Sequence, residues 1–425
     1  MLQETDNSRR EFIKAMGLGG LGLVTLSSPW MSVFAENKTA SKGASDKVRI
    51  AVIGTGSRGS YHLSYLKAME ETDNIKIVAL CDNYEPHLKE AMKYLNGSAK
   101  GYSDYRKVLE LKDLDCVLIA TPLHQHAHIA VDALKAGKHV FCEKTMAKTL
   151  PECKLMYDTA KQTGKILQIG HQRCFKPTYI KAIEYIRSGK IGKVNQIRAY
   201  WHRNNDWRRP LPSPELERQI NWRLYNEYSC GLMTELASHQ IQVANWVLGK
   251  TPVSVMGTGS INYWKDGREV YDNVALVYSY SDGTKFIYDS MISNKFYGLE
   301  EQIMGDKGTL ELETNKMYNE NPPQPAGILQ LVNDMEKGLF NTIPIAGTSW
   351  VPETASNYKG DYISLDDKID VEGKLQLIGL INSIRQNKPI PQLLEQGYHA
   401  AIWTLLGQQA IDEQKILTLP KEFSI

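Results

Sequence analysis

The chain has 425 residues, of which 42% are hydrophobic and 23% are charged. This length suits two or three domains rather than one hydrophobic core, and the composition excludes wholesale disorder. The 50 Lys and Arg residues nearly balance the 48 Asp and Glu residues, which gives a formal net charge of +2. Because no strongly positive field exists to gather phosphates, nucleic acid is not expected as a partner.

The first 35 residues resemble an export signal. Arg9 and Arg10 are followed by Phe12 and Lys14 and then by an apolar, Gly-rich run of about 12 residues. This run is shorter than the roughly 20 residues needed to cross a bilayer. The paired arginines resemble the bacterial twin-arginine signal, which exports folded proteins, and an ordinary secretory signal is the alternative. We expect residues 1–35 to be a cleaved signal, residues 36–46 a linker, and the mature protein to be periplasmic without a membrane span.

Strand and helix patterns alternate regularly from residue 47 to residue 170. Short apolar runs typical of buried strands occupy 48–53, 75–80, 115–120, 139–142 and 166–169. Amphipathic stretches typical of helices occupy 84–95, 105–111, 128–136 and 151–163. This alternation predicts an α/β domain, a doubly wound parallel sheet of the Rossmann type covered by helices on both faces.

The pattern changes in residues 171–425, which we expect to form a second domain. Period-2 segments typical of a mainly antiparallel sheet occupy 194–201, 253–261, 273–280, 285–292 and 309–313. Asp282-Gly283 between two of these segments predicts a hairpin turn. Helical periodicity returns at 373–385 and 393–409, and the Pro- and Asn-rich stretch 319–360 is expected to be an irregular insertion.

The six cysteines do not form a recognisable framework. Cys81, Cys116 and Cys142 lie in or at the end of apolar runs, where cysteine commonly acts as a small buried hydrophobe. The chain has no C-x-x-C motif and no Cys and His spacing typical of zinc sites. Neither a disulfide scaffold nor a metal is expected.

A glycine-rich turn follows the first predicted strand. Gly54, Gly56 and Gly59, with Ser57 and Arg58 between them, form the pattern G-x-G-x-x-G. In this context the pattern predicts a dinucleotide site, in which the diphosphate meets the N-terminus of the next helix. The next strand ends at Asp82, about 20 residues further on, where a carboxylate accepts ribose hydroxyls and repels a 2′-phosphate. These residues favour NAD over NADP.

Two further groups of residues, expected to bind the cofactor, follow the third and fourth predicted strands, at the sheet edge where open parallel sheets bind ligands. The first contains Thr121, Pro122, His124 and His126, and the second contains Glu143 and Lys144. A lysine beside a nicotinamide can bind a sugar hydroxyl and, with a pKa lowered by burial, can transfer a proton. The alternative is a solvated surface lysine.

A family resemblance rests on four motifs in chain order: G-T-G-S-R-G, A-T-P-L-H-Q-H, A-G-K-H-V-F-C-E-K and I-G-H-Q-R-C-F. From about residue 47 to residue 249 the chain resembles the Gfo/Idh/MocA family of NAD(P)-dependent oxidoreductases, whose members include glucose-fructose oxidoreductase, inositol dehydrogenase and the NAD-dependent glycosidases of family 109. The resemblance implies a Rossmann domain followed by a domain with a large open, mainly antiparallel sheet. It also implies a sugar or cyclitol bound between that sheet and the nicotinamide, and assembly into dimers or tetramers.

The resemblance also implies catalytic residues. The family's E-K-P lysine corresponds to Lys144, although Thr145 replaces the proline. The family's Asp-x-x-x-His pair corresponds to Glu235 and His239, expected at i and i+4 on one helix face. His239 suits acid–base chemistry because its unperturbed pKa lies near neutrality, and the alternative is a buried structural histidine.

An aromatic and basic stretch from residue 200 to residue 225 suits sugar recognition, because aromatic faces pack against sugar rings and charged groups bind their hydroxyls. Ordinary domain packing or an oligomer arm is the alternative. The residues expected to bind substrate are Trp222, Arg223 and Tyr225, with Arg173 and Tyr179 near the domain junction.

Export and a nicotinamide cofactor together constrain the reaction. A periplasmic enzyme without a pool of free NAD must retain its cofactor and restore it in each cycle. Paired oxidation and reduction of two sugars satisfies this condition. So does transient oxidation of a glycoside, followed by elimination, hydration and reduction. The alternatives are an ordinary sugar or inositol dehydrogenase with exchangeable NAD, or a non-catalytic sugar-binding protein stabilised by NAD.

Overall fold

The computed structural model describes residues 47–320, 360–364 and 372–425, all within one unit of the chain, Ser41–Ile425. The expected signal and linker at 1–46 lie outside the described residues, as does nearly all of the expected insertion. In the described part of the chain, none of the helices combines the length and the apolar character that crossing a bilayer demands.

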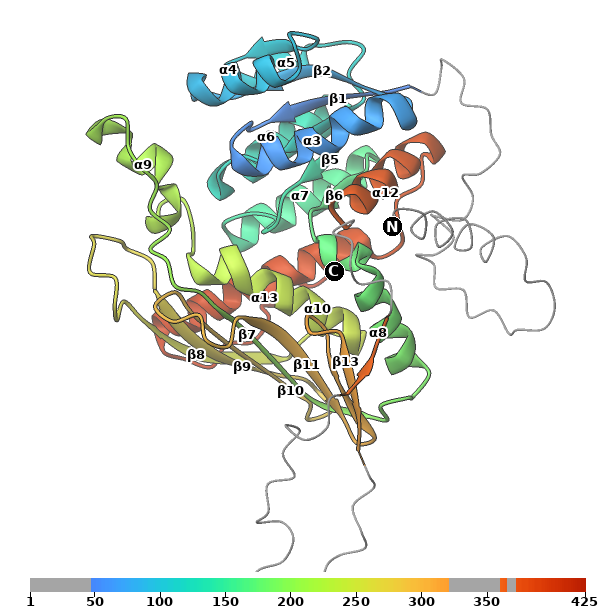
Figure 1. Ribbon diagram of the computed structural model, residues 1–425, viewed down its shortest axis with the longest axis vertical. Helices are drawn as coiled ribbons and strands as arrows, with labels where there is room; N and C mark the ends of the chain where they lie inside the picture. Colours follow the sequence, from blue (N-terminus) through green and yellow to red (C-terminus); the bar gives the residue numbers. More distant parts are fainter. Residues whose placement is uncertain (1–46, 321–359, 365–371) are drawn as a thin grey trace, which may run out of the picture. The chain divides into compact units, whose positions relative to one another are not determined.

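The first sheet has six parallel strands in the order β3-β2-β1-β4-β5-β6 (Figure 1). Their bounds are β1 Val48–Ile53, β2 Ile75–Cys81, β3 Lys100–Tyr102, β4 Cys116–Ile119, β5 His139–Cys142 and β6 Leu167–Ile169. This order confirms the doubly wound fold, with β3 added to the strands predicted. The chain leaves β1 on one side toward β2 and returns on the other side at β4, which places a ligand crevice at the carboxyl ends of β1 and β4.

The helices of this domain are α3 Ser57–Thr72, α4 Glu85–Tyr94, α5 Tyr105–Leu109, α6 His126–Lys135 and α7 Leu150–Thr163. Helix α7 illustrates how local sequence sets an element's ends. The Thr149 side chain accepts a hydrogen bond from the Glu152 amide while the Glu152 side chain binds the Thr149 amide, which forms a capping box. Gly164 ends the helix in the left-handed conformation that glycine adopts without steric cost.

The second sheet has eight strands in the order β14-β13-β12-β11-β7-β10-β9-β8. Their bounds are β7 Val194–His202, β8 Ser254–Ser260, β9 Asn273–Ser279, β10 Lys285–Met291, β11 Leu299–Gly305, β12 Gly308–Glu311, β13 Lys316–Asn319 and β14 Asp361–Tyr362. Strands β7 and β10 pair in parallel and the other neighbours pair antiparallel, as predicted for a mainly antiparallel sheet. Gly283, with φ of +90°, turns the predicted hairpin between β9 and β10.

The longer helices after the first domain are α8 Pro177–Arg187, α10 Ser238–Leu248, α12 Glu372–Gln386 and α13 Leu393–Glu413, and the short α9 spans Glu217–Ile220. Helix α13 contacts β8 and α10 of the second domain as well as α7 and β6 of the first. Helix α12 belongs to the first domain by packing, because Leu377, Leu380 and Ile381 join the hydrophobic core around β1 and α3. The two domains are thus tied together by segments far apart in the sequence.

Candidate active site

A cleft of about 1600 Å³ runs from the carboxyl ends of the first sheet to the second domain. Its walls include the glycine-rich turn, Asp82, the segments after β4 and β5, and residues of the second domain from Trp201 to His239. The cleft therefore brings together residues far apart in the chain, from Gly54 to His239.

The three glycines of the turn occupy positions with different steric requirements. A Cβ on Gly54 would lie 2.6 Å from the carbonyl carbon of Ala120, and a Cβ on Gly59 would lie 1.8 Å from the carbonyl oxygen of Gly54. These two positions need glycine for close backbone packing. A Cβ on Gly56 would meet only the His87 ring, at 3.3 Å. Gly56 is the N-cap of α3, and the first turn of this helix has no acidic residue. The amide groups at the helix N-terminus therefore suit a diphosphate.

Asp82 lies at the end of β2 with its carboxylate fixed by main-chain donors. Its Oδ2 accepts hydrogen bonds from the Thr55 amide at 2.7 Å and the Thr55 hydroxyl at 3.2 Å. Its Oδ1 accepts one from the Tyr84 amide at 2.8 Å. The residue also lines the cleft beside the glycine-rich turn, where the ribose prediction requires it.

Glu143 and Arg58 form an ion pair on the wall of the cleft. Glu143 Oε1 accepts from Arg58 Nε at 2.7 Å and contacts His62 Nε2 at 2.6 Å. Burial by itself raises the pKa of Glu143, but Arg58 and His62 outweigh it and hold the pKa well below its usual range. Arg58 therefore lines the cleft as part of a neutralised pair. Sequence reasoning missed His62, which is buried in α3 and belongs to no motif.

The segment after β4 is joined to the segment after β5 by one histidine. His126 Nδ1 lies 2.9 Å from the Thr145 carbonyl oxygen, and its Nε2 lies 3.0 Å from that of Thr121. Burial lowers the pKa of His126. Thr121, Pro122, His124 and His126 all line the cleft, and the His124 ring lies 4.8 Å from that of Tyr228.

Lys144 crosses from the first domain to the second. Its Nζ donates hydrogen bonds to the carbonyl oxygens of Glu235 at 2.6 Å and Thr234 at 3.2 Å. The Lys144–Thr145 peptide bond is cis, and the Thr145 hydroxyl donates to the same Thr234 carbonyl at 2.9 Å. Burial lowers the pKa of Lys144, while the carboxylates of Glu235 and Glu143 oppose that shift. The lysine is a partly buried group in the cleft, and the solvated alternative is not what the structure shows.

The segment that accepts the Lys144 hydrogen bonds, around Thr234 and Glu235, is not the regular α-helix that was expected. Residues Met233–Ala237 form a π-helix, and α10 begins only at Ser238. Glu235 and His239 are thus not an i and i+4 pair of one α-helix, although both line the cleft. Insertions of this kind are common at functional sites. No sequence signal in this segment distinguishes a π-helix from an α-helix.

Glu235 pairs with a predicted substrate residue. Arg223 Nε donates to Glu235 Oε2 at 2.8 Å. Burial by itself raises the pKa of Glu235, but the charges of Arg223 and Lys144 hold the pKa below its usual range. The carboxylate is therefore ionised at neutral pH, and it lies beside the lysine whose pKa it raises.

His239 is a buried imidazole on the wall of the cleft. Its ring lies 6.0 Å from that of His171 and 5.7 Å from that of Trp201, and its Nδ1 has no hydrogen-bond partner among the described residues. Burial, with the charge of Lys144, lowers the pKa of His239 well below 6.5. The ring is therefore neutral at neutral pH and has a nitrogen unpartnered within the described residues, and its role as a base stays a prediction.

The expected substrate residues divide into two groups. Trp222 and Arg223 line the cleft, with the guanidinium carbon 4.2 Å from the indole centroid. Tyr225 is not on the cleft wall, because its hydroxyl donates to Glu217 at 2.5 Å. Trp201, Arg203, Trp207 and Arg209 of the same stretch also line the cleft, although sequence reasoning did not single them out.

The prediction that Arg173 and Tyr179 bind substrate is corrected, because neither residue lines the cleft. Arg173 pairs with Glu301 at 2.5 Å and Glu313 at 3.2 Å, and the Tyr179 hydroxyl donates to both of these carboxylates at 2.6 Å. Both side chains are buried. A buried guanidinium needs carboxylate partners, and these contacts tie the two residues to Glu301 of β11 and to Glu313.

Comparisons with known proteins agree with this geometry. Residues 48–171 match the family model "Oxidoreductase family, NAD-binding Rossmann fold", and residues 179–311 match the model "GFO/IDH/MocA C-terminal domain". The chain is 28% identical over 267 residues to myo-inositol 2-dehydrogenase of Thermotoga maritima, covering 62% of this chain and 74% of that protein. It is also 28% identical over 239 residues to a glycosyl hydrolase family 109 protein of Shewanella pealeana, covering 51% of this chain and 50% of that protein.

Several solved structures share this fold. Levoglucosan dehydrogenase in complex with NADH and levoglucosan matches 88% of this chain and 100% of its own, with a TM-score of 0.68 and 19% identity. An oxidoreductase domain protein from Kribbella flavida matches 88% of this chain with a TM-score of 0.69 and 20% identity. At such identities the likeness shows the fold alone.

Proposed function

The chain belongs to the Gfo/Idh/MocA family of NAD-binding oxidoreductases, and from that premise we propose that it oxidises a ring hydroxyl of a sugar or glycoside. The observation that carries the proposal is the placement of Lys144 and His239, from different domains, on the walls of one cleft that begins at the glycine-rich turn. The catalytic roles of these residues stay predictions.

The chain's own residues fit the proton chemistry of such an oxidation. The neutral His239 ring can accept the hydroxyl proton, and the Lys144 amine, held by two carbonyls, can bind the same oxygen. Bound NAD supplies the acceptor for the hydrogen that leaves the ring carbon. Asp82 and the turn at Gly54–Gly59 would hold that cofactor, and their geometry fits it.

The substrate end of the cleft suits a ring with several hydroxyls. Trp201 and Trp222 offer aromatic faces, and the Arg223–Glu235 pair offers charged donors and acceptors. A sugar or cyclitol presents both an apolar C–H face and hydroxyl groups, so this lining supports a carbohydrate substrate.

We further propose that the protein is periplasmic and recycles a retained NAD in each turnover. The twin-arginine resemblance of residues 1–35 and the similarity to family 109 hydrolases support this reading. Oxidation of a ring hydroxyl acidifies the neighbouring C–H bond, which allows loss of the glycosidic substituent. Water addition and return of the hydrogen to the ring then restore the cofactor. The net reaction is hydrolysis, with no external oxidant.

A second candidate is an ordinary dehydrogenase with exchangeable NAD. The similarity to myo-inositol 2-dehydrogenase, which extends over 74% of that protein, favours it. Assembly into dimers or tetramers stays a prediction under either reading.

The two candidates differ in what the purified protein carries. Protein from an export-competent host should be denatured, its supernatant assayed for NAD, and the intact protein screened against glycosides, free sugars and keto sugars. Stoichiometric NAD with glycoside turnover and no net NADH supports the recycling enzyme. Strict dependence on added NAD with NADH release supports the dehydrogenase. Binding without turnover of any compound contradicts both.

A further inference from the structure

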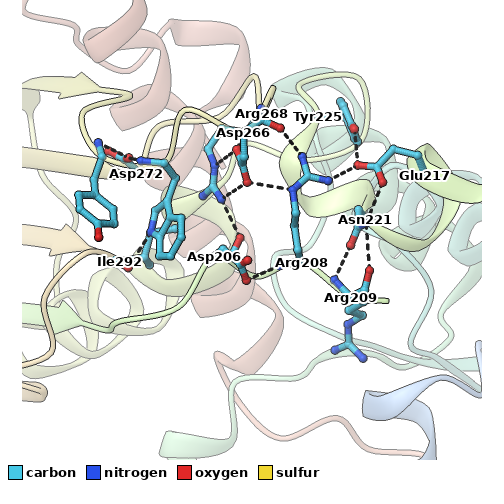
Figure 2. Close-up of polar contacts among 12 residues, drawn as sticks. Asp206, Arg208, Arg209, Glu217, Asn221, Tyr225, Asp266, Arg268, Asp272 and Ile292 are labelled. Carbon is cyan, nitrogen blue, oxygen red and sulfur yellow. Dashed lines mark hydrogen bonds and ion pairs between the residues drawn. The ribbon is translucent and has the colours of Figure 1, made fainter. Parts of the chain in front are cut away.

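A segment of the second domain that we call the arm, residues 203–225 between β7 and the π-helix, forms part of the cleft wall. Arg208 fixes it to a neighbouring loop (Figure 2). Arg208 Nε donates to Asp266 Oδ2 at 2.9 Å and its Nη2 to the Asp266 carbonyl at 2.6 Å, while its Nη1 donates to Glu217 Oε1 at 2.6 Å. One guanidinium thus joins two parts of the arm, at Arg208 and Glu217, to the loop that carries Asp266.

A second arginine strengthens this attachment. The buried Arg268 pairs with Asp266 at 2.7 Å and donates to the carbonyl of Asp206 at 2.8 Å. Charge-assisted hydrogen bonds of this geometry are stronger and more directional than neutral ones. The main chain on the N-terminal side of Arg208 is therefore also held, at the Asp206 carbonyl.

The next residue, Arg209, has its main chain fixed and its side chain free of these pairs. Its amide donates to Asn221 Oδ1 at 2.8 Å, and its carbonyl accepts from Asn221 Nδ2 at 3.3 Å. Figure 2 shows its guanidinium pointing away from the arm's ion pairs. Arg209 Nη2 lies 3.4 Å from Ser57 Oγ. Ser57 belongs to the glycine-rich turn and is the first residue of α3.

Charge distinguishes Arg209 from most other arginines of the cleft. Within the described part of the chain, carboxylates pair with five arginines that line the cleft: Arg58, Arg106, Arg208, Arg218 and Arg223. No carboxylate of the described residues lies in ion-pair distance of Arg209. Its full positive charge is directed at a helix N-terminus that itself attracts anions.

We propose that Arg209 donates hydrogen bonds to the diphosphate of bound NAD, so that the second domain holds the cofactor as well as the first. The guanidinium fork matches phosphate oxygens, and the arm's ion pairs hold it in place before the cofactor binds. Contacts from both domains slow cofactor release, which suits an enzyme that retains its NAD. This inference goes beyond the proposed function, because it depends on cofactor binding and not on the substrate or the net reaction.

The test uses Arg209→Met and Arg209→Lys, with Arg218→Met as a matched control. Arg218 lies on the same arm and lines the same cleft, but it is paired with Glu227 at 3.3 Å and Glu269 at 3.0 Å. The rate of NADH release from the loaded protein is measured by displacement, and affinities for ADP and adenosine are measured by calorimetry. We expect Arg209→Met to release NADH about 10-fold faster and to bind ADP about 10-fold more weakly.

Adenosine affinity should be unchanged in Arg209→Met, and Arg209→Lys should fall between that variant and the parent. Arg218→Met should behave as the parent. Parental ADP affinity and NADH release in Arg209→Met would overturn the inference. Equal losses for ADP and adenosine would also overturn it, because they would indicate a displaced arm rather than a diphosphate contact. A parent that binds NADH but converts no sugar would contradict the proposed function while leaving this test intact.

Discussion

The nucleotide half of the cleft is positioned by strand ends, whereas the arm across from it is positioned by ion pairs. Gly54, Asp82, Thr121 and Lys144 each follow a strand of one parallel sheet, so the strand order alone brings them together. The arm has no strand of its own between residues 205 and 225, and Arg208 holds it through Asp266 and Glu217.

This difference separates two kinds of sensitivity to mutation. A side chain at a strand end is placed by the whole buried sheet, so its replacement should remove a contact without moving the frame. A segment held by a few ion pairs should move when a better-shielded pair such as that of Arg208 is lost, whereas the more exposed pairs of Arg218 contribute little. The predictions below test this distinction, beginning with the largest expected effect.

Lys144→Met should lower the rate at which bound NAD is reduced in a single turnover by about 10²–10⁴-fold. The amine that contacts the Thr234 and Glu235 carbonyls is lost, while the nucleotide contacts are kept. Stopped-flow absorbance of the nicotinamide measures the rate. Lys148→Met, in the same segment but away from the cleft wall, is the control and should match the parent. A Lys144→Met variant that works at the parent rate removes the lysine from the chemical step.

His239→Ala should cause a loss of similar order, about 10²–10⁴-fold, with NAD still bound. The neutral ring on the cleft wall is the group expected to accept the hydroxyl proton. His399→Ala, which truncates a histidine of α13 outside the cleft, is the matched control. If the parent rate persists in His239→Ala, the histidine is structural or serves only a later step.

Asp82→Ala should weaken NAD binding by roughly 10- to 150-fold for each charged hydrogen bond lost to the ribose, and should relax the rejection of NADP. Binding of both dinucleotides is measured by fluorescence titration. Glu85→Ala, an exposed carboxylate at the start of α4, serves as the control. Unchanged affinity and selectivity would remove Asp82 from the ribose site.

Arg208→Met should loosen the arm without unfolding the first domain. Loss of the guanidinium leaves the carboxylates of Glu217 and Asp266 without this partner, which costs about 1–3 kcal/mol. Hydrogen exchange of the arm's amides should accelerate, and that of β1 and β4 should stay at the parent rate. Equal acceleration in both regions would contradict the distinction between the two halves of the cleft.

Glu235→Gln should change the pH profile more than the maximal rate. Glu235 raises the pKa of Lys144, so removing its charge should lower that pKa further. Lys144 binds the substrate oxygen as a protonated donor, which exists below its pKa, so the alkaline limb of kcat/KM should move to lower pH. A limb that stays in place or moves to higher pH would show that Lys144 does not set it.

Sequence reasoning predicted the nucleotide half well because its signals are local. The strand β1, the glycine-rich turn and Asp82 follow one another within about 35 residues, and each has a steric or electrostatic reason to be there. Lys144 could be found in the same way, since it follows a buried strand of the same sheet.

The remaining features depend on contacts that the sequence does not display. Arg173 and Tyr179 were expected in the cleft, but their partners Glu301 and Glu313 lie more than 100 residues away. The π-helix at Met233–Ala237 has the same apolar pattern as an ordinary helix. Helix α12 joins the first core although it follows the second sheet in the chain.

The most direct test of the account follows the nicotinamide of the purified holoenzyme during one turnover of a converted glycoside, with no NAD added. The account predicts that the absorbance band of the reduced nicotinamide rises and then returns to the oxidised baseline, with hydrolysed product and no free NADH. A glycoside converted without any change in that band, or NADH accumulating in proportion to product, would contradict it.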